Sequence, residues 1–283
     1  MTDEQLRQEI IRLGPWHHDI TVRNGISTTI SAEVEYPRSF GRVSPIKFRP
    51  DFVRRMTSVY PNGLEGRSVM DYSCNCAECL FWAKELGAGR CFGSDVHEHW
   101  INQADFLLEH REGPKDDIEV QVRDLYELPE LGLEPFDVVL SHGVFYHLPD
   151  PILGLKVAAD LAKELLVVTT ATAAGSPDGY LKAGREGTRA PLSGVYGLQW
   201  LPTGPEVMQE ILAWLGFPAT RLDFWRQETR KGRGRLSLLA ARDEATFAHY
   251  DSVVAAPDVR ESSITSGGST GVDAQRSAVR RWL

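Results

Sequence analysis

Long hydrophobic runs are missing from this sequence of 283 residues. No stretch approaches the ~18 consecutive apolar residues that a membrane-spanning helix requires. The first residues, MTDEQLRQEIIRL, carry acidic side chains and lack the apolar centre and the small-residue cleavage site of a secretory signal. We therefore expect a cytoplasmic protein without a membrane segment.

Sustained positive charge is missing as well. The formal net charge is −8, and the two short basic stretches, 230–235 and 276–281, are typical of a charged turn and a solvated tail. Proteins that bind nucleic acids neutralise phosphates with a basic surface. The composition therefore gives no reason to expect a nucleic-acid partner and favours a small-molecule substrate. The oligomeric state stays open, with a homodimer among the alternatives.

Cysteine is scarce, and three of the four cysteines fall close together, as Cys74, Cys76 and Cys79. A structural zinc site usually takes four ligands from two separated pairs. The spacing C-x-C-x-x-C supplies three, and Cys91 falls in a predicted buried strand. Because cytoplasmic cysteines stay reduced, disulfides are not expected. We expect small buried apolar side chains and no metal site, with a metal or redox protein as the alternative.

Between residues 61 and 245, short apolar runs alternate with amphipathic or mixed stretches. This alternation is typical of an α/β fold with a parallel sheet covered by helices on both faces. Two later runs, 222–227 and 235–241, are joined by the turn-rich KGRG and predict a hairpin that adds one antiparallel strand. The predicted parallel strands are 68–72, 90–94, 118–123, 136–141 and 164–170.

The segments around this pattern predict the domain boundaries. A capping-box pattern starts a helix over 3–13, and residues 1–60 are expected to form an N-terminal helix and a substrate-side cap of the 61–245 domain. The stretch 171–203 is too long for a tight connection and predicts a lid-like insertion. The Ser-, Gly- and Thr-rich end predicts a partly flexible tail over 246–283. Further helices are predicted over 51–59 and 205–215.

Three aspartates follow successive predicted strands, 24 and 29 residues apart. Ligands of open parallel sheets bind outside the carboxyl ends of the strands. Asp95, after the second strand, can accept hydrogen bonds from both ribose hydroxyls, and Asp124, after the third, can meet an adenine amino group. Asp71, after the first strand, can orient the loop that contacts the amino-acid end of the ligand. The pattern therefore predicts a nucleoside cofactor.

Glycine is missing where a dinucleotide would need it. The loop after the first strand, residues 73–78, is S-C-N-C-A-E, whereas pyrophosphate binding requires G-x-G-x-x-G. A pyrophosphate would meet side chains in this loop instead of bare backbone. NAD and FAD are therefore disfavoured as cofactors.

Four blocks of sequence carry a family resemblance. Residues 71–77 are D-Y-S-C-N-C-A, 93–95 are G-S-D, 103–106 are Q-A-D-F, and 136–151 are F-D-V-V-L-S-H-G-V-F-Y-H-L-P-D-P. With these blocks the chain resembles class I S-adenosylmethionine (SAM) dependent methyltransferases. Within that class it resembles the subgroup related to the tRNA-uridine carboxymethyltransferase fold. The resemblance extends over about residues 14–240 and includes an N-terminal W-H-H-x-I.

This resemblance implies a Rossmann-like fold with a seven-stranded, mostly parallel sheet. It also implies SAM as the cofactor and S-adenosylhomocysteine (SAH) as its product. Both glycines of the family's loop are replaced here, by Ser73 and Ala77. Because glycine permits a positive φ and a close backbone approach, a non-catalytic relative with a decayed cofactor loop stays open. The residues expected to contact the cofactor are Asp71, Tyr72, Ser73, Cys74, Asn75, Asp95, Val96, Asp124, Leu125 and Ser141.

Methyl transfer from a sulfonium is an in-line displacement, and a hydroxyl acceptor needs a base to take its proton. Histidine suits that role because it titrates near neutrality. In the resembled fold the loop after the fourth strand faces the methyl group. We therefore expect His147 and His142 as candidate bases, His147 before His142, with Tyr146 lining the acceptor pocket. The expected reaction is O-methylation of a hydroxyl in a sugar, nucleoside or secondary metabolite.

The N-terminal segment and the lid-like insertion are expected to enclose the acceptor. Aromatic side chains can stack on a ring or sugar, and an arginine can meet a carboxylate or phosphate. A tRNA-modifying enzyme that uses SAM or its carboxylated form stays as an alternative, and Lys47 lies in the right region for the extra cation that it needs. The residues expected to bind substrate are Trp16, His17, His18, Tyr180, Arg185, Tyr196 and Trp200.

Overall fold

The structure is a computed structural model that describes residues 1–37, 43, 49–173, 179–228, 233–254 and 258–260. Five neighbouring strands of one sheet are parallel, in the order β5-β4-β3-β6-β7, with β5 at the edge. The strand order changes direction at β3, and ligands of such sheets bind at this switch point. The strands are β3 (Val69–Asp71), β4 (Cys91–Asp95), β5 (Ile118–Val122), β6 (Phe136–His142) and β7 (Ala162–Ala173).

The predicted hairpin completes the sheet. Strand β11 (Arg233–Ala241) pairs antiparallel with β7, and β10 (Ala219–Glu228) pairs antiparallel with β11. These seven strands confirm the predicted mostly parallel sheet with one antiparallel strand. A short eighth strand, β12 (Asp258–Arg260), pairs parallel with β10 at the sheet edge.

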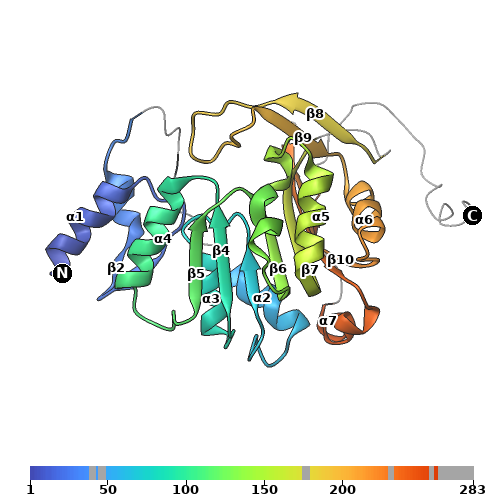
Figure 1. Cartoon of the computed structure of the whole chain (residues 1–283), viewed down its shortest axis with the longest axis horizontal. Helices are drawn as coiled ribbons and strands as arrows, with labels where there is room; N and C mark the ends of the chain where they lie inside the picture. Colours follow the sequence, from blue (N-terminus) through green and yellow to red (C-terminus); the bar gives the residue numbers. More distant parts are fainter. Residues whose placement is uncertain (38–42, 44–48, 174–178, 229–232, 255–257, 261–283) are drawn as a thin grey trace, which may run out of the picture.

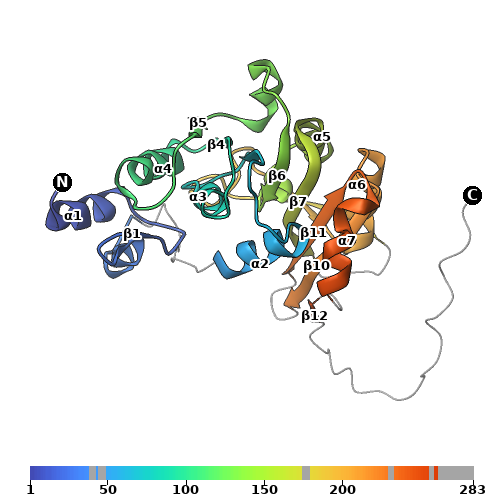
Figure 2. The same ribbon diagram turned by 90° about the horizontal axis from the view of Figure 1, so that it is seen from below.

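Helices cover both faces of the sheet, as Figures 1 and 2 show. Successive side chains of a strand point to opposite faces, so Val138 packs in one core and Val139 in the other. This is why the strands are apolar along their whole length and not only at alternate positions. One face carries α2 (Arg49–Val59), α3 (Glu78–Glu85), α4 (Glu98–His110) and α7 (Ala248–Val253), and the other carries η3 (Leu125–Leu131), α5 (Pro151–Leu161) and α6 (Pro205–Trp214).

The N-terminal segment is fixed against α4. Helix α1 (Asp3–Leu13) begins at the predicted capping box. Buried Gln103 of α4 donates from Nε2 to the carbonyls of Leu13 at 2.7 Å and Pro15 at 3.1 Å. The Thr28 hydroxyl donates to the carbonyl of His18 at 2.5 Å, and these bonds set the path of the W-H-H segment. The remaining elements here are β1 (Thr21–Arg23), β2 (Ile26–Ser27) and η1 (Thr28–Glu33).

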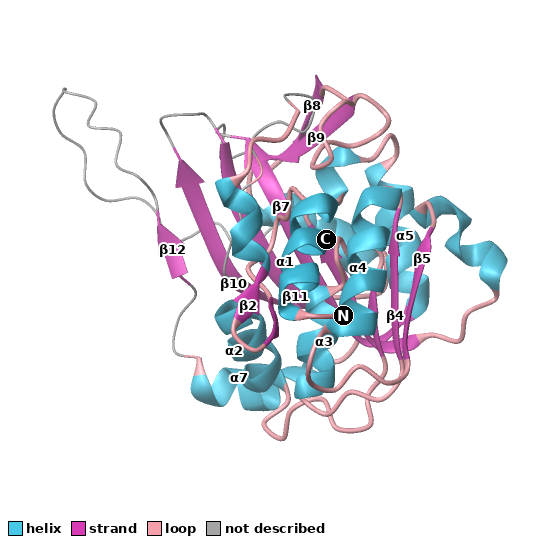
Figure 3. Ribbon diagram, turned by 90° about the vertical axis from the view of Figure 1, so that its left-hand side faces the viewer, coloured by secondary structure: helices cyan, strands magenta, loops and turns pink. Residues whose placement is uncertain are grey.

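The predicted lid-like insertion contains a hairpin. Strands β8 (Leu181–Arg185) and β9 (Leu198–Pro202) pair antiparallel and are joined by the loop 186–197. The hairpin lies across the top of the molecule in Figure 1, where β9 contacts β7 and η4 (Phe145–His147). In Figure 3 the carboxyl end of β10, which runs parallel to β7, points toward this hairpin. The insertion therefore lies over the edge of the sheet where ligands bind.

Two segments differ from the predicted boundaries. Helix α2, inside the predicted 1–60 cap, packs on the sheet beside α3 and α7. It is tied there because Arg55 Nε lies 3.0 Å from Asp223 Oδ2 of β10, and both side chains are buried. The start of the predicted tail is also packed, since Phe247 and Tyr250 of η6 (Glu244–Phe247) and α7 are buried.

The rest of the predicted flexible tail, 261–283, lies outside the described residues. Within the described ranges, no helix has the length and apolar character needed to cross a membrane.

Candidate cofactor and acceptor site

The carboxyl ends of β3, β4 and β6 open into one cavity of about 830 Å³. The N-terminal segment and the loop 186–197 contribute its other walls. Cavities of this size, with mixed apolar and polar walls, hold cofactors and small substrates in other proteins.

Every predicted cofactor residue except Ser141 lines this cavity. The Ser141 hydroxyl is buried and lies 2.5 Å from the hydroxyl of Tyr72, so it supports the wall from behind. Burial raises the pKa of Tyr72 and keeps its hydroxyl protonated. The predicted cofactor residues at the wall are Asp71, Tyr72, Ser73, Cys74, Asn75, Asp95, Val96, Asp124 and Leu125.

Only one of the two family glycine positions in this loop has a left-handed backbone. The φ of Ser73 is not positive, and its hydroxyl donates to the carbonyl of His142 at 3.0 Å. The left-handed residues are Asn75, with φ 51°, and Ala77, with φ 62°. Asparagine tolerates this region, whereas for alanine it costs about 1–2 kcal/mol. Serine is therefore accommodated at the first family glycine, and the strain falls on Ala77.

Two buried carboxylates hold this loop. Asp95 accepts from the backbone N–H of Asn75 with Oδ2 and from that of His97 with Oδ1, both at 3.0 Å. Burial raises the pKa of Asp95. Asp71 accepts from the N–H of Ser73 at 3.2 Å, and burial, with the charges of Asp95 and Glu78, raises its pKa to about 8.

The loop 186–197 rests on the cofactor side of the cavity. The Tyr196 hydroxyl donates to Oδ2 of Asp124, so this tyrosine, predicted to bind substrate, instead contacts a predicted cofactor residue. The same loop also contacts His147 through Glu186, so the insertion covers both the predicted cofactor residues and the predicted base. Two further contacts are Trp100 Nε1 with the carbonyl of Pro191 and His97 Nε2 with the carbonyl of Ser193, each at 3.0 Å.

His147, a predicted base, is oriented by the same loop. Its Nδ1 lies 2.5 Å from Oε2 of Glu186, and the backbone nitrogen of Gly194 lies 3.1 Å from that Nδ1 and 3.2 Å from that oxygen. A Cβ at Gly194 would lie 2.7 Å from His147 Cβ, so only glycine permits this approach. The Tyr146 ring lies 3.9 Å from the His147 ring. If Nδ1–H donates to the carboxylate, Nε2 keeps a lone pair that can accept a proton.

A second histidine–carboxylate pair also lines the cavity. His18 Nδ1 is in ion-pair contact with Oε1 of Glu78, and the rings of His17 and His18 lie 4.6 Å apart. Burial lowers the pKa of His17 and of His18 to about 3 and raises the pKa of Glu78. The buried environment therefore favours a pair without net charge.

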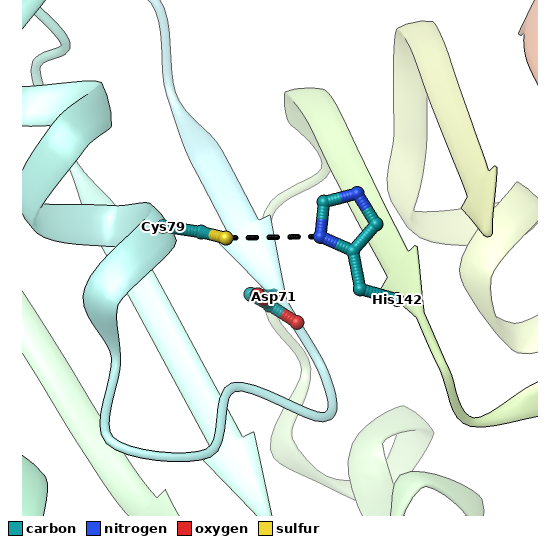
Figure 4. A group of neighbouring side chains, drawn as sticks. All are labelled: Asp71, Cys79 and His142. Carbon is teal, nitrogen blue, oxygen red and sulfur yellow. Dashed lines mark hydrogen bonds between the residues drawn. The ribbon is translucent and has the colours of Figure 1, made fainter. Parts of the chain in front are cut away.

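The side chains of Asp71, Cys79 and His142 lie close together, as Figure 4 shows. Cys79 Sγ lies 3.7 Å from His142 Nδ1. Burial raises the pKa of the Cys79 thiol and lowers the pKa of His142. His142, the other predicted base, thus directs Nδ1 to a cysteine.

Four of the predicted substrate residues do not reach the cavity. Trp16 is fully buried, donates from Nε1 to the carbonyl of Ile10 at 2.7 Å and packs on Phe106, so it is a core residue. The others belong to the β8–β9 hairpin or its approach and lie outside the cavity wall. They are Tyr180, Arg185 and Trp200.

The sequence missed three side chains of this site. Glu78 begins α3 directly after the cofactor loop, and that position was the signal for it. Cys79 was interpreted as an apolar core residue. Glu186 had no signal, because it lies 39 residues from His147 in a segment without a recognisable motif.

Comparison with known proteins identifies the class of this domain. Residues 70–164 match the family model described as a methyltransferase domain. The N-terminal domain of EvdMO1, solved in the presence of SAH and D-fucose, has a similar fold, with a TM-score of 0.65. It is 18% identical, and the alignment covers 85% of this chain and 97% of that one. Residues 70–164 are therefore similar to methyltransferase domains, and the chain has the Rossmann-like fold of the SAH-bound EvdMO1 domain.

The curated relatives carry one name. A tRNA U34 carboxymethyltransferase from Pseudomonas putida is 30% identical over 172 residues, which are 59% of this chain and 48% of that protein. The protein of that name from Campylobacter hominis is 36% identical over 93 residues, which are 33% of this chain and 31% of that protein. The chain thus spans less than half the length of these relatives. They agree with the subgroup that the sequence resembles.

Proposed function

We propose that the protein transfers the methyl group of SAM to a hydroxyl of a small-molecule acceptor inside this cavity. The observation that carries the proposal is that the strand-end carboxylates and an oriented histidine line the same enclosed space. A sugar, nucleoside or secondary metabolite is the acceptor class that we infer. The D-fucose in the EvdMO1 structure supports a sugar within that class.

The cofactor side has the groups that SAM requires, and SAM, when bound, supplies a methyl group on a sulfonium that is ready for displacement. Each oxygen of Asp95 accepts one backbone N–H, which leaves lone pairs for the two ribose hydroxyls. Asp124 is the candidate partner of the adenine amino group. The loop 73–77 is the candidate seat of the amino-acid end.

His147 is the base that the geometry favours. With Nδ1–H donated to Glu186, Nε2 takes the proton of the acceptor hydroxyl as the oxygen attacks the methyl carbon. The new O–C bond forms as the C–S bond breaks, and the products are the methyl ether and neutral SAH. Glu186 then stabilises the imidazolium, as a carboxylate does for histidine in other enzymes. His142 is less suited because its Nδ1 faces Cys79.

Titration calorimetry of SAM and SAH tests the cofactor half of this proposal. We expect micromolar binding to the wild type and at least about 100-fold weaker binding to Asp95→Ala, because two charge-assisted hydrogen bonds are lost. Asp116→Ala, an exposed acid away from the cavity, is the matched control and is expected to bind normally. A folded wild type that binds neither ligand would replace the proposal with a non-catalytic relative.

A tRNA substrate is the second candidate, favoured by the names of the curated relatives. The net charge of −8 argues against it, and Lys47, expected as an extra cation, lies outside the described residues. Measurement of tRNA binding across salt concentrations separates the two. Phosphate contacts would make the affinity fall steeply with salt. Such a dependence, together with modified tRNA, would overturn the small-molecule proposal.

A further inference from the structure

We propose that Asp71, Cys79 and His142 bind a zinc ion at the wall of the cavity. The three residues come from separate elements, the end of β3, the first turn of α3 and the end of β6. Figure 4 shows the Cys79 sulfur facing the His142 ring, with the Asp71 side chain between their two elements. One ligand atom from each lies within 4.8 Å of the other two.

The measured separation fits tetrahedral zinc. Zinc binds sulfur at about 2.3 Å and imidazole nitrogen at about 2.0–2.1 Å, so the two atoms lie about 3.5–3.6 Å apart across a tetrahedral angle. Cys79 Sγ and His142 Nδ1 lie 3.7 Å apart. A thiol–imidazole hydrogen bond explains the Cys79–His142 contact alone, and a zinc ion would in addition bind the Asp71 carboxylate, which has an oxygen within 4.8 Å of both atoms.

The donor set and its charge also point to zinc. Sulfur and imidazole donors disfavour magnesium and calcium, which prefer oxygen ligands. A thiolate and a carboxylate together balance the two positive charges of the ion. In the described part of the chain, Asp71 forms no ion pair with lysine or arginine, and Arg55, whose charge reaches Cys79 and His142, is paired with Asp223. Burial without a cation drives the Asp71 carboxyl toward its neutral form, and a bound cation would favour the carboxylate.

Glu78 supplies an independent observation at the same wall. It is 3% exposed, lines the same cavity, and its Oε2 is buried without a hydrogen-bond partner, while Oε1 contacts His18. Buried carboxylate oxygens are normally satisfied by a donor. A water held by the zinc ion is the donor that this oxygen lacks.

Three protein ligands leave one position of tetrahedral zinc open, as in catalytic zinc sites. All three line the cavity, so the open position faces it. This further step rests on the proposed function: the acceptor hydroxyl would bind there, and the ion would lower its pKa before His147 takes the proton.

Metal analysis of untagged protein tests the site without any activity measurement. We expect about one zinc ion per chain, because the described residues hold one such set of three ligands. In zinc-free protein reloaded with cobalt, a thiolate-to-cobalt charge-transfer band is expected. Cys79→Ala should lose that band. It should also weaken zinc binding by more than about 10- to 100-fold, which is the cost of losing a residue that only hydrogen-bonds to a ligand. His142→Ala should weaken zinc binding but keep the band.

Cys91→Ala is the matched control, because Cys91 is a buried cysteine in β4 outside the trio. It should keep both zinc and the band, and Cys79→Ser replaces Cys79→Ala if the alanine variant fails to fold. Wild-type protein that holds no more zinc than Cys79→Ser would overturn the site. SAM titration of the zinc-free wild type is a separate readout, so failure of the zinc site and failure of the methyltransferase proposal are distinguishable.

Discussion

The two sides of the cavity are built in different ways. On the predicted cofactor side, Asp71 and Asp95 end β3 and β4 and Asp124 follows β5, so the topology of the sheet brings them together. On the acceptor side, His18 comes from the N-terminal segment and Glu186 from the loop 186–197, neither of which belongs to the sheet. The fold therefore fixes the cofactor seat, whereas the acceptor chemistry depends on segments added around it.

The largest expected effect separates the two sides. Replacement His147→Ala should lower the rate of methyl transfer by about 10²- to 10⁴-fold, because the general base is lost. The dissociation constant of SAM should stay unchanged, since His147 lies on the acceptor side. SAH formation by mass spectrometry and calorimetry on the same samples measure both quantities.

Glu186→Gln is the companion variant, because it removes the carboxylate but keeps the size of the side chain. It should lower the rate of transfer less than His147→Ala does. A His147→Ala variant with the wild-type rate would contradict the assignment of His147 as the base. The candidate base would then be His18, which contacts Glu78.

Acid should weaken the acceptor side first. Burial, with the nearby charges of His18 and Arg235, lowers the pKa of His17 from 6.5 to about 3. Between those values the unfolded chain binds one more proton than the folded chain. The contribution of His17 to the free energy of unfolding should therefore fall by up to about 1.4 kcal/mol for each unit by which the pH is lowered below 6.5. Above pH 6.5 this contribution should stay constant.

Denaturant unfolding from pH 7.5 down to about 4 measures this slope. His17→Gln should reduce this slope by the amount that corresponds to about one bound proton. His249→Gln, on α7 and away from the cavity, should leave the contribution of His17 unchanged. An unchanged slope in His17→Gln would mean that His17 is charged in the folded protein.

Removing one hydroxyl sharpens the boundary between the sides. Tyr196→Phe breaks the hydrogen bond that holds the loop 186–197 on Asp124. Since such a bond contributes about 0.5–1.5 kcal/mol, SAM should dissociate about 2- to 10-fold faster. Stopped-flow dissociation measures this, with Tyr180→Phe, outside the cavity, as the control. Equal rates in both variants would show that the loop does not retain the cofactor.

The smallest effect concerns the backbone of the cofactor loop. Ala77→Gly should stabilise the protein by a net amount of about 0.5–1 kcal/mol. Glycine removes the strain of the positive φ, and the larger conformational entropy of glycine in the unfolded chain offsets part of this gain. Thermal unfolding should shift upward by a few degrees, while SAM affinity stays the same. Ala83→Gly, inside α3, should instead destabilise. A destabilised Ala77→Gly would contradict the strain assigned to this position.

The sequence predicted that Asp71, Asp95 and Asp124 meet at one edge of the sheet, because local patterns determine their positions. The apolar runs before Asp71, Asp95 and Asp124 define strands, and parallel strands end at one edge of the sheet. The same reasoning could not predict which loop residue is strained. The family pattern has glycines at positions 73 and 77, and of these two positions only Ala77 has a positive φ.

The acceptor side escaped prediction because its contacts are long-range. Nothing near His147 in the sequence indicates Glu186, and Trp16 looked like a stacking residue although its indole is satisfied by Ile10 in the core. The cysteine spacing argued against zinc. The proposed zinc site uses only Cys79 of that cluster, with partners from two other strands that spacing cannot reveal.

The most direct test of the account is whether wild-type protein makes SAH only when a small-molecule hydroxyl is present. The protein is incubated with SAM and a panel of sugars, nucleosides and hydroxylated metabolites, and SAH and methylated products are quantified together. The account predicts SAH in equal amount to an O-methylated product for at least one acceptor class. Tight SAM binding with turnover on tRNA alone would contradict it.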